Sequence, residues 1–209
     1  MPSNPNYDAF VRALKFDEKV TLFFGKEPLS VTTGLIHSTL RIILNDINAC
    51  AEPGSNHLAF PRAMCLMVAI DLLGKMRSGS DSSNAVGLRF IAFTEFALQG
   101  PTFGIDIGEK VYEFRCALHH SYRMPTEWRP NGSKTKLSWR FRLVEDKTES
   151  RLTWDTPDKC TFINLYRLQE EIEAGISRFR SVVCGYTDPD DQIKFSSMFD
   201  KYGWLYVGE

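Results

Sequence analysis

The sequence predicts a mostly helical protein, an up-down helical bundle with one β-hairpin inserted before the last long helix. Apolar residues recur at the three- and four-residue spacing of helices in five stretches. One region, between residues 136 and 155, instead alternates polar and apolar residues as strands do. With 43% hydrophobic residues, the 209-residue chain can bury a full core without metals or disulfides.

The first two helices of the bundle are expected over residues 35–50 and from about Pro61. Pro53 and Gly54 end the first of them. Proline is well tolerated in a first helical turn, so the second helix can start at Pro61. Its segment AMCLMVAIDLLG is apolar nearly all round, which predicts a central, buried helix.

Two more helices are expected after the polar loop SGSDSSN (78–84). The third covers residues 86–98 and ends before Gly100 and Pro101. The fourth covers residues 106–122, reads DIGEKVYEFRCALHHSY and ends before Pro125.

The hairpin is expected to pair residues 136–145, KLSWRFRLVE, with residues 151–155, RLTWD. Thr161 is then in position to cap the last long helix, over residues 162–183. Its apolar residues recur on one inner face.

The chain divides into three expected parts: an N-terminal extension (1–34), a helical domain (35–184) and a C-terminal appendage (185–209). The appendage begins with the polar stretch YTDPDD, and a short helix is expected at about 190–201.

The composition indicates a cytoplasmic protein with no membrane span. The N-terminus is polar and lacks an apolar signal core. No apolar stretch approaches the length of about 18 residues that a span needs. The five cysteines are odd in number, widely spaced and without a C-x-x-C pair, which suits a reducing compartment.

Candidate functional residues gather in the second and fourth expected helices. Arg115, His119, His120 and Arg123 fall within nine residues. Arg115 and His119 share a helix face, whereas His120 lies about 140° round from Arg115. Asp71 is an acid on a nearly apolar helix, so it must be paired, protonated or facing a polar cleft.

Three segments together resemble the helical core of the HEPN superfamily. They are AIDLLG (69–74), RFIAFTEFAL (89–98) after a Ser/Gly loop, and VYEFRCALHHSY (111–122). The resemblance extends loosely over residues 35–183, and 111–122 carries its motif. That motif is R-x-x-x-x-H, and here Arg115 and His120 match its two fixed positions.

Two residues depart from the family's pattern. Cys116 stands where asparagine or another polar residue is common, and His119 stands where an apolar residue is usual. The sequence from Cys116 to His120 also resembles half of a zinc set, but no second paired spacing follows, so no metal or other cofactor is expected.

The resemblance implies a metal-independent endoribonuclease, in a defence or stress response, that works as a homodimer on RNA or another polyanion. Histidine titrates near neutrality, so His120 becomes the acid/base. The planar fork of Arg115 becomes the phosphate clamp. His119, Tyr122 and Arg123 become RNA contacts, and Asp71 orients Arg115 or His120. An antitoxin-like protein is a further partner that the resemblance allows.

Charge distribution fits a polyanionic partner. Residues 111–142 hold seven Lys or Arg and two acids, whereas the remainder holds 18 basic and 24 acidic residues. Aromatic residues interleave with these cations, as in proteins that stack single-stranded bases, although they can equally pack on the bundle. The members of this set are Tyr122, Trp128, Trp139 and Phe141.

Structural interpretations stand beside the functional ones. His120 can satisfy terminal carbonyls at a helix end, and Arg115 can form an internal bridge to Asp71. The alternative function is therefore a non-catalytic HEPN-like module that binds RNA, a nucleotide or a protein partner. A helical scaffold with a purely internal Arg115–Asp71 pair is the third possibility.

Overall fold

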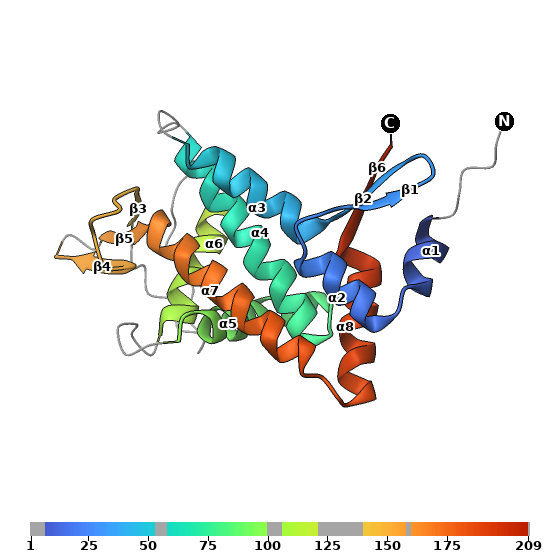
Figure 1. Ribbon diagram of the computed structural model, residues 1–209. Helices are drawn as coiled ribbons and strands as arrows, with labels where there is room; N and C mark the ends of the chain where they lie inside the picture. Colours follow the sequence, from blue (N-terminus) through green and yellow to red (C-terminus); the bar gives the residue numbers. More distant parts are fainter. Residues whose placement is uncertain (1–6, 53–57, 100–105, 121–139, 158–159, 209) are drawn as a thin grey trace.

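A computed structural model describes residues 7–52, 58–99, 106–120, 140–157 and 160–208. Most of these residues are helical, which confirms the mostly α class (Figure 1). The α-helices are α1 (Tyr7–Ala13), α2 (Phe16–Phe24), α3 (Thr39–Cys50), α4 (Ala59–Ser78), α5 (Val86–Ala97), α6 (Ile107–His120), α7 (Leu165–Cys184) and α8 (Pro189–Tyr202). The strands are β1 (Leu29–Val31), β2 (Gly34–Ser38), β3 (Arg140–Val144), β4 (Thr153–Thr156), β5 (Cys160–Asn164) and β6 (Trp204–Gly208).

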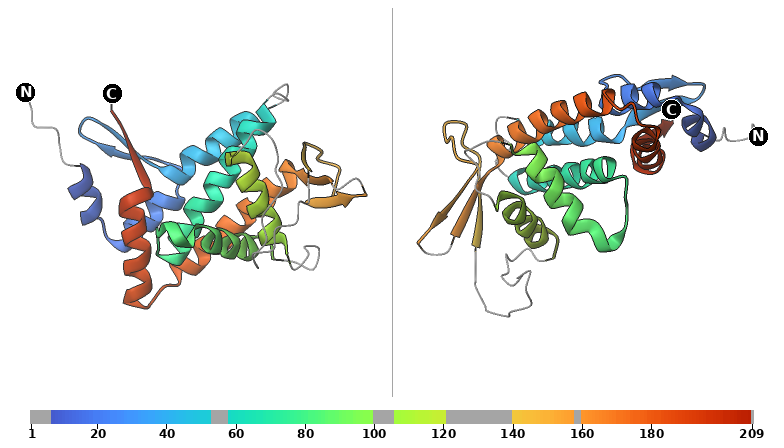
Figure 2. Two further views of the ribbon diagram at one scale, coloured as in Figure 1. Left: turned by 180° about the vertical axis from the view of Figure 1, so that it is seen from behind. Right: turned by 90° about the horizontal axis from the view of Figure 1, so that it is seen from below.

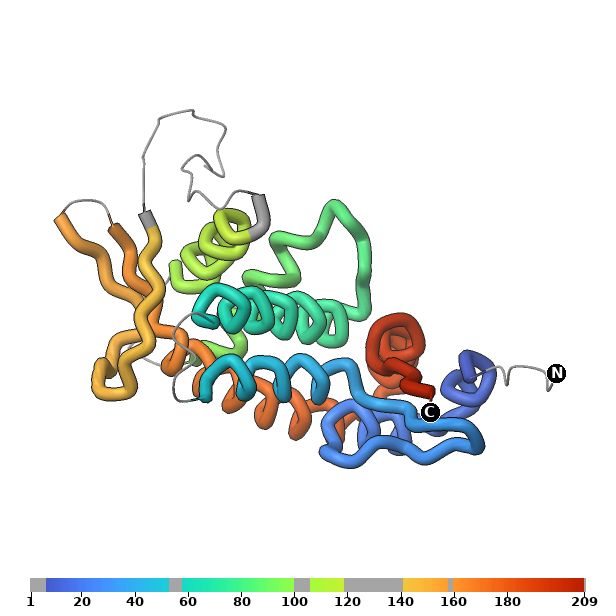
Figure 3. Tube along the Cα trace, turned by 90° about the horizontal axis from the view of Figure 1, so that it is seen from above, coloured from blue at the N-terminus to red at the C-terminus, as the bar shows by residue number. Residues whose placement is uncertain are grey.

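Helix α4 lies at the centre of the molecule, as its apolar sequence predicts. It contacts α3, α5, α6, α7 and α8, and Figure 3 shows it between α3 and α6. One stripe of α4 nevertheless reaches the surface: the Val68 side chain is 44% exposed, and the side chains of Asp71 and Lys75 are partly exposed. These residues are three and four apart, so they share one helix face.

The expected first helix is shorter at its start, which corrects the prediction of a helix from residue 35. Residues 34–38 form strand β2, in which buried and more exposed side chains alternate. Helix α3 begins after Ser38, whose hydroxyl accepts a hydrogen bond from the Arg41 amide. Short apolar runs fit either period, so the sequence alone does not separate this strand from the helix.

The prediction that residues 136–145 pair with residues 151–155 in a hairpin is wrong. Both expected segments contain a strand, but the sheet order is β3-β5-β4, so β3 and β4 do not pair. Strand β3 runs parallel to β5, and β4 runs antiparallel to it. Because residues 160–164 form strand β5, helix α7 begins after Asn164, whose side chain caps it. The predicted cap Thr161 lies within the strand, and its hydroxyl donates to Asp155.

The two ends of the chain build a second sheet and part of the core. Strands β1, β2 and β6 form a sheet in which the C-terminal β6 pairs antiparallel with β2. Beneath it, Phe23 of α2 packs edge-on against Phe195 and Phe199 of α8. Helix α8 confirms the expected short helix after residue 185. Residues from 1–34 and 185–209 thus share one hydrophobic core with the bundle.

None of the helices in the described part of the chain is both long and apolar enough to cross a membrane. Helices α4 and α7 are the longest, at 20 residues each.

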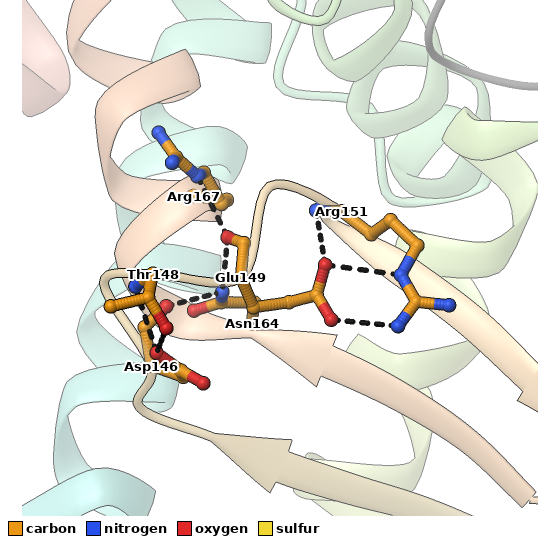
Figure 4. A network of polar contacts seen from close by, with 6 residues as sticks. All are labelled: Asp146, Thr148, Glu149, Arg151, Asn164 and Arg167. Atoms are coloured by element: carbon orange, nitrogen blue, oxygen red, sulfur yellow. Dashed lines mark hydrogen bonds and ion pairs between the residues drawn. The ribbon is translucent and has the colours of Figure 1, made fainter.

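The turn between β3 and β4 is tied to the start of α7 by a polar network (Figure 4). The Asn164 amide donates to the carbonyls of Asp146 (2.7 Å) and Glu149 (3.2 Å). Arg167 also donates to the Glu149 carbonyl, at 3.0 Å. The Glu149 carboxylate accepts two hydrogen bonds from the Arg151 guanidinium, at 3.0 and 2.7 Å. This network places the small sheet against the bundle.

The Glu149 carboxylate gives the fold a specific dependence on pH. Hydrogen bonds from the Arg151 side chain lower the pKa of Glu149 from 4.5 to about 2. The contribution of the ionised Glu149 carboxylate to the free energy of unfolding is therefore complete above pH 4.5, and it is lost as the pH falls toward 2. We expect the melting temperature of the parent to exceed that of Glu149→Gln at pH 6, and the difference to shrink between pH 4.5 and 2. A difference independent of pH would contradict this role.

Candidate functional site: an arginine on helix α6

The predicted Arg115 lies where α4, α5 and α6 meet. Helix α5 packs against both α4 and α6, and the view from behind in Figure 2 shows the three helices together. We define the Arg115 site as the polar side chains at this junction: Asp71 and Lys75 of α4, Arg89 of α5, and Tyr112, Arg115 and Cys116 of α6.

Asp71 is held by two cations of the site. Its carboxylate lies 3.3 Å from the Lys75 ammonium and 3.5 Å from the Arg89 guanidinium. Arg89 is buried and also donates to the Ser82 carbonyl at 2.7 Å. Among the described residues, the ion-pair partners of Asp71 are therefore Lys75 and Arg89, not Arg115. The predicted need for a partner is met by residues that the sequence did not single out.

Arg115 has a different environment from the other arginines of the core. Its guanidinium carbon lies 5.8 Å from the ring centroids of both Phe90 and Tyr112. Its Nε is buried and has no hydrogen-bond partner, and no described carboxylate lies within ion-pairing distance. In contrast, the fully buried Arg62 donates to Gln169 and Glu145. The Arg115 guanidinium is thus oriented by aromatic rings and not neutralised by the described residues.

Two further buried atoms of the site lack hydrogen bonds. They are Oδ1 of Asp71 and Nε of Arg89, both on the α4–α5 side of the junction. Buried polar groups of native proteins are nearly always hydrogen-bonded, so each exception needs an explanation. Oδ1 of Asp71 is the atom that lies 3.5 Å from the Arg89 guanidinium, so the donors without a partner at this junction are Nε of Arg89 and Nε of Arg115.

Tyr112 and Cys116 form the remaining part of the site. Burial raises the pKa of the Tyr112 hydroxyl, and the nearby Cys116 thiol raises it further by charge and by hydrogen bonding. The positive charge of Arg115 lowers the pKa of Tyr112. The thiol at the motif's usual polar position therefore interacts with a neighbouring phenol one helical turn away.

Other predicted site residues fall at or beyond the end of what the structure describes. The backbone of α6 continues through His119 and His120, but their side chains lie outside the described residues. Tyr122 and Arg123 lie outside them as well, as do Trp128 and Trp139. Phe141 is described, and its ring packs 5.6 Å from Phe114 of α6, so for this residue the packing interpretation holds.

The sequence interpretation missed Arg89 and Tyr112. Arg89 is a lone cation at the start of an otherwise apolar segment, which is the same signal that singled out Asp71. Tyr112 lies three residues before Arg115 and so shares its helix face. Within the described ranges, no three His, Cys, Asp or Glu side chains gather closely enough to hold a metal ion.

No family model, curated protein or solved structure that we compared with the chain matches it. The resemblance to the HEPN superfamily therefore depends on the residues of the three quoted segments.

Proposed function

We propose that this protein is a metal-independent endoribonuclease of the HEPN type, with Arg115 as the phosphate clamp and His120 as the acid/base. The observation that supports it is the state of Arg115. Its Nε is buried without a hydrogen-bond partner, and its guanidinium has no ion-pair partner among the described residues, so an anion that reaches it would supply the missing partner. RNA phosphate is the anion that a planar, two-pronged cation suits best.

The proposed chemistry uses ordinary properties of these side chains. The 2′-hydroxyl oxygen forms a bond to phosphorus while the bond from phosphorus to the 5′-oxygen breaks, which leaves a 2′,3′-cyclic phosphate. His120 takes the 2′-hydroxyl proton, because imidazole titrates near neutral pH. The Arg115 guanidinium holds the phosphate oxygens as negative charge accumulates. The leaving 5′-oxygen takes a proton from the protonated His120 or from water, and His119 contacts the RNA.

Charge around the site supports a nucleic-acid substrate. The Arg115 site contains three cations, Lys75, Arg89 and Arg115, against the single carboxylate of Asp71. Residues 111–142 extend this excess along the chain, with seven Lys or Arg and two acids. A local positive field of this kind increases the concentration of polyanions near the site.

The resemblance to the superfamily extends the proposal to the assembly. We propose a cytoplasmic homodimer whose two motifs contribute to one cleft, acting in defence or stress response, with an antitoxin-like protein as a possible partner. Sedimentation velocity at micromolar concentration tests the dimer, which we expect to be the main species.

A non-catalytic module is the second candidate function, and the Tyr112–Cys116 interaction favours it. The motif position that is commonly polar carries the Cys116 thiol, which contributes to the raised pKa of the Tyr112 hydroxyl. In that case the Arg115 site binds RNA, a nucleotide or an acidic protein partner and releases it unchanged.

One experiment separates the two candidates. The purified protein is incubated with single-stranded RNA in excess chelator, and the products are analysed for 2′,3′-cyclic phosphate ends. The nuclease proposal expects such ends to accumulate at the same rate with and without chelator. Salt-dependent RNA binding with intact RNA would refute catalysis and support the module. If the protein neither binds nor cleaves the RNA, both RNA-directed functions are refuted.

A further inference from the structure

A groove lies between helices α1 and α8, and it shares no residue with the Arg115 site. Helices α1 and α8 are neighbours there, on the side opposite the β3-β5-β4 sheet (Figures 1 and 2). The groove has a cavity volume of about 620 Å³. One wall is a continuous face of α8, from Pro189 to Lys201, and the other is formed by Arg12 and Phe16. Its size falls in the range of small-molecule sites.

The groove combines apolar surface with hydroxyl groups. The Ile193 side chain is 64% exposed although it lines the groove, and Phe16 packs edge-on against the core residue Phe195 at 5.9 Å. Ser196 and Ser197 lie one turn further along α8 and also line it. An apolar group placed here would cover Ile193 and Phe16, while the serines supply hydrogen bonds.

One positive charge of the lining is not compensated. Asp200 is paired with the buried Lys19 at 2.7 Å, and Lys201 is paired with Asp81 at 3.1 Å. Arg12 is exposed, and it forms no ion pair or hydrogen bond with any described residue. The groove therefore presents one available guanidinium at the margin of an apolar surface.

We propose that this groove binds a small monoanionic amphiphile, a carboxylate with an apolar chain of medium length. The carboxylate binds Arg12, and the chain lies along α8 over Ile193 and Phe16. The single unbalanced charge accounts for one anionic group, and the cavity volume accounts for a small molecule. This site is independent of the proposed ribonuclease function, because it shares no residue with the Arg115 site.

The test titrates decanoate into the full-length protein below its micellar concentration, with neutral decanamide as the matched ligand. We expect saturable one-to-one binding of decanoate, with decanamide about two- to fivefold weaker, the range for one ion pair at an exposed site. Arg12→Gln should remove the preference for decanoate, and Ile193→Ser should weaken both ligands. Val182→Ser is the control, because Val182 is similarly exposed (46%) on α7 but does not line the groove.

Three results with decanoate would overturn the proposal. They are no saturable binding of decanoate, equal binding of decanoate and decanamide, or binding that Arg12→Gln and Ile193→Ser leave unchanged. Binding of an acidic amphipathic peptide in place of decanoate would also overturn it, and would assign the groove to a protein partner. All the substituted side chains are exposed, so the variants should fold like the parent.

Discussion

Replacing Arg115 by glutamine is expected to slow RNA cleavage by at least about 100-fold, because the phosphate loses its bidentate cation as charge develops. The change keeps a polar but uncharged group, on a shorter side chain, beside Phe90 and Tyr112. Replacing His120 by asparagine is expected to reduce the rate by about 10²- to 10⁴-fold, since no group then moves the 2′-hydroxyl proton. Single-turnover cleavage of a labelled RNA in chelator measures both effects.

RNA affinity distinguishes the two roles. Arg115→Gln should weaken RNA binding and also flatten its dependence on salt, because one phosphate contact is lost. His120→Asn should bind RNA almost as tightly as the parent while failing to cleave it. Arg180→Gln is the matched control, because Arg180 is an exposed arginine of α7 outside the site. Cleavage by both variants at the parental rate would show that neither side chain takes part in the reaction.

Long periodic helices are the part of this fold that the sequence predicts well. The α4 segment is apolar nearly all round, and α5 and α6 carry apolar residues over three or more turns, so the sequence predicts these helices close to their observed positions. The sequence predicts helix starts within strands β2 and β5, because their short apolar pairs, Leu35-Ile36 and Phe162-Ile163, fit both periods. The partner of β2 is β6, which is distant in sequence, and β5 pairs with β3 in parallel. No local sequence pattern indicates either pairing.

The Arg115 site shows the same division between local and long-range information. The helical position of Arg115 could be predicted because residues 111–120 lie within one helix. The ion-pair partner of Asp71 could not be predicted, because the packing of α4 on α5 decides whether Asp71 pairs with Arg89 or with Arg115. Arg89 resembles a surface cation in the sequence and becomes a buried one only when α4, α5 and α6 assemble. A residue's chemistry is thus readable from the sequence more often than its partner.

Arg62 is the clearest case of a role that only the tertiary structure defines. It lies near the start of α4 and is fully buried. Its guanidinium donates to Gln169 of α7 at 3.2 and 2.6 Å and pairs with Glu145 at 3.1 Å. The Tyr166 ring lies 4.2 Å from the guanidinium carbon. Arg62 therefore connects α4, α7 and the turn after β3.

Replacing Arg62 by methionine is expected to lower the free energy of unfolding by about 3 kcal/mol, because Gln169 and Glu145 lose their buried partner. For a chain of this length, the melting temperature should fall by about 6–12 °C. The matched control Arg180→Met replaces an exposed arginine of α7 and should change stability by less than about 0.5 kcal/mol. Urea unfolding followed by circular dichroism measures both variants.

A second substitution tests whether Arg62 and Glu145 stabilise the fold as an ion pair. A second substitution, Glu145→Gln, keeps the hydrogen bond and removes the charge, so it should cost less than Arg62→Met. If the two substitutions in one chain cost less than the sum of the separate costs, the guanidinium and the carboxylate stabilise the fold as a pair. If Arg62→Met leaves the unfolding midpoint unchanged, methionine packing replaces the network in full, and the connection of the small sheet to the bundle must instead depend on Asn164 and Arg167.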